Sequence, residues 1–333
     1  MKFARQLNWV VWLGLLAAPL LLDEWRVSQL AQLLTYGIFA LSLAFIWGQA
    51  GILCFGQAIF FGVGAYVMAL ITLGMVPPLG TSQWTGLLLA VAAAGLAGVL
   101  AGLFLLRGRG LSGAHLAIVT LCASFIAEVA ARRWDFIGGF NGLLGVPPLE
   151  WPFERADPFM SSVETYLLIL ALAALSYFIL LFLTRSPFGT LLAAIASNEN
   201  RTRFFGYDVF SAKLVAFTIS AMIAGLAGAL FTAQFGFVSP PLLGVALSTE
   251  VLIWVAVGGR GVLLGAMLGA ILVRSVENSL SDTLGEYWLL TMGLLFVAVV
   301  VFAPSGLFGK LLRLPIPARL LGKAGAGIGK LGQ

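Results

Sequence analysis

The sequence predicts an all-α, polytopic membrane protein with about ten transmembrane segments, some of them broken by glycine. Hydrophobic residues make up 60% of the 333 residues and charged residues only 10%. Mean hydropathy is +1.02. This composition leaves too little charge to cover the surface of a soluble globule. Several windows also reach the length of about 20 predominantly apolar residues that a helix needs to cross a bilayer.

The ten segments fall into two classes. The long, continuously apolar ones are residues 28–47, 84–106, 166–183, 214–233 and 287–302. The shorter or glycine-interrupted ones are residues 7–22, 55–75, 111–131, 245–257 and 262–276. Residues 7–22 follow a basic start and resemble a signal peptide, but no small-x-small cleavage pattern follows them, so we expect this first span to be retained. A membrane domain over residues 1–309 and a basic tail over residues 310–333 are therefore predicted.

Basic residues indicate the orientation of the segments. If ten segments alternate from a cytoplasmic N-terminus, fourteen Lys and Arg residues fall inside, against five outside. The five are Arg26, Arg132, Arg133, Arg155 and Arg274. Because cytoplasmic loops carry the excess of basic residues, both termini are expected in the cytoplasm. The net charge of +5 then follows from topology, so no nucleic-acid partner is expected, and the tail would rest near anionic lipid.

The longest polar stretch within the apolar sequence is the cytoplasmic loop of residues 185–213. Phe188, Leu191, Leu192 and Ile195 are spaced i, i+3, i+4, i+7, which predicts a helix with one apolar stripe. Such a helix lies on a surface or packs against protein.

A second, shorter helix is expected after a break. Ser197 would cap it, with Glu199 in its first turn, Arg203 in its last and Gly206 just beyond its end, following the preferences of helix caps and of the helix dipole. Anchoring to lipid is one function for such a loop. Because the helix is polar apart from Phe204 and Phe205, insertion of these two aromatic side chains into a partner's groove is favoured.

Forty glycines suggest close helix packing and broken helices. Small residues on one face, such as Gly95, Gly98 and Gly102, or Gly225 and Gly228, let membrane helices approach closely. A second group cuts residues 41–70 into pieces: Gly48, Gly51, Gly56, Gly62 and Gly64. Broken helices expose backbone groups that suit the carboxylate and ammonium of an α-amino acid, so a translocation path is expected here.

Polar side chains inside the segments are further candidates. Glu250 is the stronger carboxylate candidate for the path, with a buried structural hydrogen bond as the alternative. Glu128 lies about one turn before Arg132 and Arg133 and is expected to pair there or to reach the interface. Gln57 is a polar candidate of the same path.

The sequence contains no nucleotide-binding motif, no nucleophile with a base and no metal constellation. Cys54 and Cys122 lack metal-ligand spacing, and His115 is the only histidine. These observations predict a non-enzymatic chain. If it moves solute actively, the energy must come from a separate protein.

Motifs spread over nearly the whole chain carry a family resemblance. They are "LSLAFIWGQAGILCFGQAIFFGVGAYVMAL" (41–70), "HLAIVTLCASFIAEVA" (115–130), "FIGGFNGLLGVPP" (136–148), "FGTLLAAIASNENRTRFFGYD" (188–208), "KLVAFTISAMIAGLAGALFTAQFGFVSP" (213–240), "STEVLIWVAVGGRGVLLGAMLGA" (248–270) and "VVVFAPSGLFG" (299–309). In order and spacing they resemble the LivM-type permeases, membrane subunits of branched-chain amino acid ABC importers. Gln57 stands where relatives commonly have histidine, and Arg260 interrupts a Gly-rich turn.

The resemblance implies a transporter in the inner membrane of a prokaryote that imports leucine, isoleucine and valine. Its partners would be a second homologous permease, two ABC ATPase subunits that use ATP, and a periplasmic or extracellular substrate-binding protein. The family's coupling loop has the loose pattern Glu-Ala-Ala, three residues, Gly, and here Gly206 matches literally while Asn200, Arg201 and Thr202 hold the first three positions. No cofactor is expected in this chain.

The same resemblance makes the outer loop of residues 132–164 a docking surface for the binding protein. Its candidate residues are Gly138, Gly139, Asn141 and Gly142, although the Gly and Pro content also fits an ordinary turn-rich loop. Urea or another small polar solute stays open as the substrate. An ion-coupled secondary transporter is a weaker alternative, which would need an intramembrane carboxylate relay.

Overall fold

The computed structural model describes residues 2–107, 113–151, 159–284, 293 and 306–308. Over these residues the secondary structure is helical apart from one short strand pair and an isolated bridge between Glu150 and Phe159. The α-helices are α1 Lys2–Leu21, α2 Glu24–Ala50, α3 Gln57–Thr72, α4 Gln83–Leu106, α5 Gly113–Arg132, α6 Ser162–Arg185, α7 Pro187–Ser197, α8 Glu199–Phe204, α9 Val209–Phe235, α10 Val245–Gly258 and α11 Leu263–Leu284. The strands are β1 Leu143–Leu144 and β2 Phe237–Val238. Short 3-10 helices are η1 Pro77–Leu79, η2 Asp135–Ile137, η3 Gly139–Asn141 and η4 Pro240–Leu243.

Five described helices, α2, α4, α5, α6 and α9, are long and apolar enough to cross a bilayer. They coincide with the expected segments 28–47, 84–106, 111–131, 166–183 and 214–233. The chain is therefore all-α and polytopic over its described part. The expected segment at residues 287–302 and the tail at residues 310–333 lie outside the described residues.

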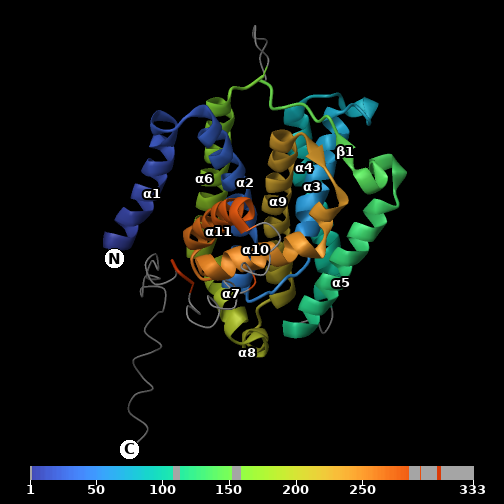
Figure 1. The fold of residues 1–333 in the computed structure, drawn as a ribbon. Helices are drawn as coiled ribbons and strands as arrows, with labels where there is room; N and C mark the ends of the chain where they lie inside the picture. The colour runs from blue at the N-terminus through green and yellow to red at the C-terminus, as the bar shows by residue number, and fades with distance from the viewer. Residues whose placement is uncertain (1, 108–112, 152–158, 285–292, 294–305, 309–333) are drawn as a thin grey trace, which may run out of the picture.

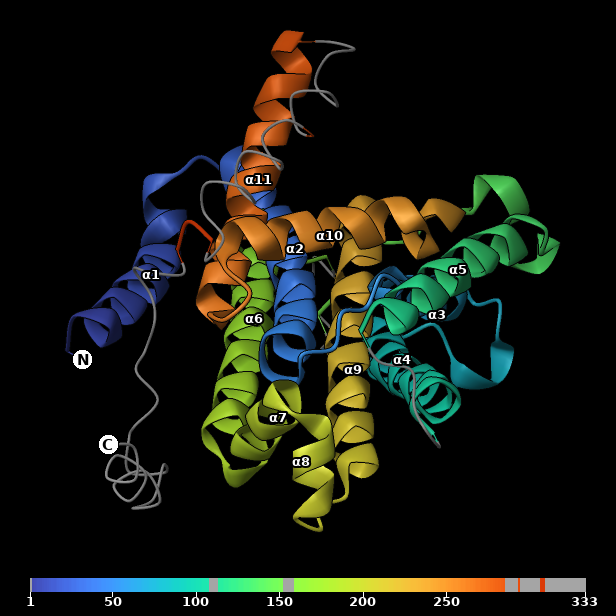
Figure 2. The same cartoon turned by 90° about the horizontal axis from the view of Figure 1, so that it is seen from below.

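The other expected segments are shorter than a straight crossing requires. The helix α3 has 16 residues, and the apolar part of α1 covers only Asn8–Leu21. The helices α10 and α11 meet at an angle of 117°, so that they form one broken span or a re-entrant loop. The expectation of two separate crossings at residues 245–257 and 262–276 is thus replaced by a bent pair. Figure 2 shows α10 running across α2 and α9 and α11 turning away from it.

The helix α9 is the centre of the bundle, because it packs against α2, α3 and α4. Its glycines allow this packing. A Cβ on Gly64 of α3 would collide with the backbone of Gly225, and one on Gly228 would collide with the carbonyl oxygen of Phe61. Backbones therefore touch directly between α3 and α9.

The glycine stripe on α4 has the same function. A Cβ on Gly95, Gly98 or Gly102 would lie only 2.8 Å, 2.6 Å or 2.5 Å, respectively, from side-chain atoms of α9. Packing was expected for this stripe and for Gly225 and Gly228, and the structure confirms it.

The two ends of the bundle differ (Figure 1). At one end, β1 and β2 pair antiparallel, with Leu143 opposite Val238, and join the loop after α5 to the end of α9. At the other end lie α7 and α8, between α6 and α9. The chain enters α6 through a capping box, in which Ser161 and Glu164 satisfy each other's backbone amides.

Candidate functional site

The helical backbone is interrupted between α2 and α3. The helix α2 ends at Gly51, whose φ of +67° is left-handed, and α3 begins after Gly56. Residues 51–56 between them are not helical. Gly51 and Gly56 therefore break the chain as expected. Gly48 lies inside α2, and Gly62 and Gly64 lie inside α3, so the expectation that these three interrupt the helix is wrong. They are packing glycines, since a Cβ on any of them would collide with the backbone or side chain of another segment.

Hydroxyl groups of neighbouring helices stabilise the break. The amide of Phe55 donates to Thr120 Oγ1 of α5 at 3.0 Å, and the amide of Ala58 donates to Ser248 Oγ of α10 at 3.2 Å. Ser124 of α5 donates to the carbonyl of Leu243, just before α10, at 2.7 Å. Backbone groups exposed by a break at membrane depth need such partners. The break is therefore bound to α5 and α10.

Gln57, the first residue of α3, forms the buried polar centre of this region. Its Nε2 donates to Ser42 Oγ of α2 at 3.0 Å and to Ser220 Oγ of α9 at 2.9 Å. All three side chains are fully buried. The two serine hydroxyls donate to backbone carbonyls of Phe39 and Ser42, so both accept from the amide. Gln57 Oε1 is buried and has no hydrogen-bond partner among the residues that the structure describes, which leaves one acceptor available beside the break.

Glu250, the other polar candidate, lies in a different cluster. Glu250 Oε2 lies 3.7 Å from Nη1 of Arg274 on α11. The same Nη1 pairs with Glu277 Oε2 at 2.7 Å, and Nη2 of Arg274 donates to the hydroxyl of Tyr36 at 2.8 Å. The guanidinium further stacks over the Tyr36 ring at 4.3 Å. This arrangement joins α2, α10 and α11 through one arginine. The structure therefore brings Glu250 to Arg274 and not to Gln57.

Glu128 has a local role at the end of α5. It forms an ion pair with Arg132 one turn later. Pairing with this arginine was one of the two roles expected for Glu128, and it is confirmed. Its carboxylate also lies against Gly244, the N-cap of α10. A negative charge is favourable near a helix N-terminus.

The polar loop folds as a helix, a break, a second helix and a glycine turn. In α7, Leu192 and Ile195 are buried and Phe188 and Leu191 are partly buried, so the predicted apolar stripe is confirmed. The helix α8 covers Glu199–Phe204, as expected. Ser197, however, is the last residue of α7, and Asn198 caps α8 by accepting from the amide of Arg201 at 2.9 Å. The asparagine was missed because Ser, Asn and Asp are about equally good caps.

The far side of α8 faces solvent. Phe204 is 92% exposed and Phe205 is 75% exposed. Gly206 follows with φ +84°, and no atom of the described residues lies near the position of a Cβ. The predicted left-handed turn is thus present, and it follows two aromatic side chains that are mostly exposed.

The near side of α8 is joined to α9 by an ion pair. Glu199 accepts from Lys213 Nζ at 2.5 Å and from Arg203 Nη2 at 3.1 Å. Lys213 is only 8% exposed. An ion pair with one partner largely buried resists screening by salt better than a surface pair.

The polar loop also touches the break directly. A Cβ on Gly51 would lie 3.1 Å from the Cβ of Ala196, near the end of α7. The loop is therefore in contact with the membrane break at Gly51 and, through Glu199 and Lys213, with the start of α9.

The outer-loop candidates shape the backbone. Gly138, Gly139 and Gly142 all have positive φ, and Gly142 packs against the backbone of Val238 and Ser239. They form the tight turns that lead into β1, so only Asn141 of the four presents a side chain, which is exposed. Glycines with positive φ are expected in such turns whether or not a partner docks there.

Several site residues were missed from the sequence. The hydroxyl-bearing residues around the break are Ser42, Thr120, Ser124, Ser220 and Ser248. A signal was present, since each is a hydroxyl residue inside an apolar run. Such residues also form hydrogen bonds to the backbone of their own helix. Periodicity alone therefore does not distinguish a hydroxyl that bonds within its helix from one that bonds to another segment.

Comparison with known proteins identifies the family. The family model described as branched-chain amino acid transport system / permease component matches residues 26–300. No solved structure matches the chain.

Three curated relatives are similar over most of the chain. The high-affinity branched-chain amino acid transport system permease protein LivM is 34% identical in Escherichia coli and 33% identical in Salmonella typhimurium, in both cases over 87% of this chain and 72% of the relative. The corresponding protein BraD of Pseudomonas aeruginosa is 22% identical over 83% of this chain and 92% of the relative. The chain thus belongs to the permease family of branched-chain amino acid transport systems.

Proposed function

We propose that this chain is the membrane-spanning permease subunit of an ABC importer and that it moves leucine, isoleucine and valine across the inner membrane. The observation that carries the proposal is the loop of α7 and α8, which presents two bare aromatic side chains to solvent and touches the membrane break with its other end. In this family the permease itself is no enzyme and holds no cofactor, and ATP is hydrolysed by separate ATPase subunits.

Coupling to ATP hydrolysis is assigned to α8 and the turn after it. The residues are Glu199, Asn200, Arg201, Thr202, Arg203, Phe204, Phe205 and Gly206. Exposed aromatic residues surrounded by charge are typical anchors of a protein interface. When the ATPase subunits close on ATP, α8 would move with them, and the contact of Ala196 with Gly51 and the pair of Glu199 with Lys213 would carry this motion to α2 and α9. Alternating access follows if the two helices rearrange around the break.

The substrate path is proposed along the break. An α-amino acid carries an ammonium group that needs acceptors and a carboxylate that suits helix N-terminal amides. Gln57 Oε1 provides an unused acceptor, and the N-terminus of α3 begins at the same residue. Gly51 and Gly56 bound the path, while Gly62 and Gly64 keep α3 close to its neighbours. Glu250 is a less favoured path residue, because Arg274 is its neighbour.

Topology and assembly are part of the proposal. Both termini and the α7–α8 loop would face the cytoplasm, because the positive-inside count places them there. A second, homologous permease would complete the pore, and two ATPase subunits would bind at α8. A periplasmic or extracellular binding protein would dock at the loop of residues 132–164, near Asn141. Ten crossings of the bilayer would be reached only if α10 and α11 each crossed it and residues 287–302 formed a further crossing.

Uptake of labelled leucine by cells with and without the chain tests the substrate. We expect deletion to abolish high-affinity uptake, and unlabelled isoleucine and valine, but not urea, to compete in cells that express the chain. A gradient-driven transporter would keep importing after ATP depletion if the ion gradient is maintained, whereas this one should stop. Leucine uptake that is unchanged by deletion would contradict the substrate assignment, and urea would then be tested as the labelled solute.

A further inference from the structure

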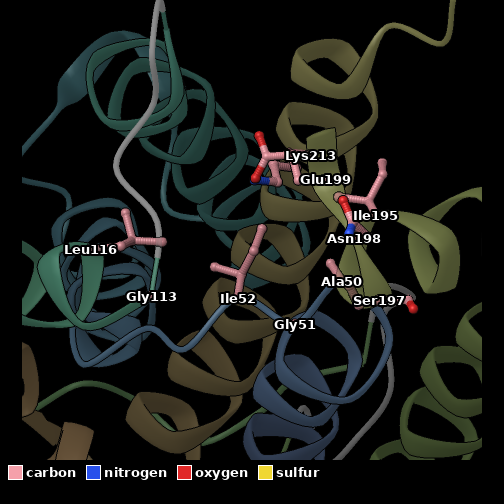
Figure 3. Close-up of a pocket in the computed structure, with 11 residues that line it drawn as sticks. Ala50, Gly51, Ile52, Gly113, Leu116, Ile195, Ser197, Asn198, Glu199 and Lys213 are labelled. Atoms are coloured by element: carbon pink, nitrogen blue, oxygen red, sulfur yellow. The ribbon is translucent and has the colours of Figure 1, made fainter. Parts of the chain in front are cut away.

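A pocket lies where the break, the polar loop and two further helices meet (Figure 3). Its volume is about 200 Å³, and it is lined by the end of α2, the start of α5, the junction of α7 and α8, and the start of α9. At about 30 Å³ for each water in the liquid, this is room for about seven waters or for one small organic molecule. The pocket lies at the same end of the bundle as α8, which the proposed topology places in the cytoplasm.

The lining combines opposite charges with an aliphatic wall. Lys213 and Glu199 lie together on one side of the pocket, and Leu116 lies on the opposite side, with Ile52 between them. Ile195 adds a third apolar side chain to the lining. A ligand that satisfies this lining needs a carboxylate for the ammonium of Lys213, an ammonium for the carboxylate of Glu199, and a hydrocarbon part for the wall.

We propose that this pocket binds an aliphatic α-amino acid from the cytoplasmic side, as a product site at the Gly51 end of the break. The inference rests on the proposed function, since it assumes that branched-chain amino acids leave the transporter at this end. An amino acid has both charged groups on one carbon, and the ammonium of Lys213 and the carboxylate of Glu199 are 2.5 Å apart. The two protein charges can therefore pair with one zwitterion.

Occupancy of the pocket has a consequence for coupling. The zwitterion competes for the ion pair that joins α8 to α9, because each of its charged groups takes the place of one partner. With the pair weakened, motion of α8 is transmitted less completely to α9. Leucine that accumulates on the product side therefore slows further import.

Equilibrium binding of labelled L-leucine to the full chain in lipid nanodiscs tests the site. Ser197 is an exposed residue that lines the pocket, so a tryptophan at this position would fill the opening. Ala193 is the control position, because it is exposed on the same helix but does not line the pocket. We expect Ser197→Trp to weaken binding at least tenfold and Ala193→Trp to leave it unchanged. Lys213→Gln should weaken binding to a similar extent, whereas Arg203→Gln, which removes the other partner of Glu199, should not.

Analogues test the chemistry of recognition. Leucinamide lacks the carboxylate and 4-methylpentanoate lacks the ammonium, so each should compete at least tenfold more weakly than leucine. Leucine binding that is absent, or insensitive to Ser197→Trp, would overturn the inference.

A second readout separates this inference from the proposed function. In proteoliposomes of the complete transporter, leucine enclosed on the product side should slow ATP-driven uptake of labelled leucine, and Ser197→Trp should remove this inhibition. If uptake proceeds but product-side leucine has no effect, the feedback fails and the proposed function stands. If the chain binds leucine at the pocket but the transporter imports none, the proposed function fails instead.

Discussion

The two polar interruptions in this apolar chain differ in what they contact. At the break between α2 and α3, the carboxamide of Gln57 and the hydroxyls around it are enclosed by protein, and each serine accepts and donates within the bundle. At α8, by contrast, Phe204 and Phe205 are exposed, while Thr202 is buried and Glu199 pairs with Lys213 of α9. Polar groups that find partners inside stabilise an unusual backbone, whereas apolar groups left outside indicate a partner that is another molecule.

This difference predicts different costs of mutation. Interhelical hydrogen bonds in a membrane protein contribute about 0.6 kcal/mol each on average, while loss of a central aromatic anchor costs about 2 kcal/mol or more of binding energy. Changes at the break should therefore alter transport with little loss of stability, and changes at α8 should alter association with no loss of stability.

The largest effect is expected where backbones touch. Gly64→Val places a side chain on the Gly225 backbone, which has no room to move, and we expect a loss of about 3 kcal/mol or more in folding free energy. Thermal unfolding of the detergent-solubilised protein measures it. Gly14→Val is the matched control, because Gly14 lies in α1 with no atom within 4 Å of a Cβ. Equal stability of the two variants would contradict the assigned packing of α3 on α9.

The next effect concerns the exposed aromatic residues. The double variant Phe204→Ala and Phe205→Ala should fold normally and bind the ATPase subunit at least about 30-fold more weakly, which corresponds to about 2 kcal/mol. Titration of the ATPase subunit onto the chain in nanodiscs measures the affinity. Phe136→Ala with Phe140→Ala, two exposed aromatic residues at the opposite end, is the control and should bind normally. If both double variants bind the ATPase equally well, α8 is not the docking element.

A smaller change in stability but a clear change in transport is expected at the break. Gln57→Leu removes hydrogen bonds to Ser42 and Ser220 and should cost only about 1 kcal/mol in stability. Leucine uptake should fall at least tenfold at normal expression, because the unused acceptor beside the break is lost. Gln234→Leu removes a comparable amide, which donates to Thr35 at 2.7 Å, and should preserve uptake. Loss of uptake in both variants alike would point to a general packing defect.

The smallest effect is a pH dependence at the exit of the loop. Hydrogen bonds from the hydroxyl and amide of Ser211 lower the pKa of Asp208, the N-cap of α9. A lowered folded-state pKa means that this carboxylate contributes stability above its ordinary pKa near 4, and that the contribution is lost as the pH falls below that value. Thermal unfolding measured between about pH 6 and pH 3 should therefore show that the unfolding temperature falls slightly more steeply with decreasing pH for the natural protein than for Asp208→Asn. Identical slopes would mean that the cap does not depend on charge.

The sequence predicted the parts of the fold that depend on local pattern. Continuous apolar length identified α2, α4, α6 and α9, and the order of charge and glycine identified α8 apart from its cap, which is Asn198 and not Ser197. Both signals lie within one helix, where periodicity and cap chemistry decide the structure.

The parts it missed depend on contacts between distant segments. Gly62 and Gly64 resemble helix breakers in the sequence, yet their function is to admit Leu243 and the Gly225 backbone. The 117° bend between α10 and α11 likewise cannot be read from hydropathy, which does not record direction. For Glu250 the sequence left a path role and a structural role open, because its neighbour Arg274 is 24 residues away on another helix.

The most direct test of the account compares two glycines with the same backbone strain. Gly206 and Gly145 have φ of +84° and +78°, and within the described part of the chain neither has an atom near the Cβ position, so valine at either costs about 1–2 kcal/mol of strain. Only Gly206 lies at the proposed ATPase contact. Leucine imported per ATP hydrolysed should be measured for both variants in proteoliposomes of the complete transporter. We expect this ratio to fall several-fold for Gly206→Val and to stay at the natural value for Gly145→Val, and equal ratios for the two would contradict coupling through α8.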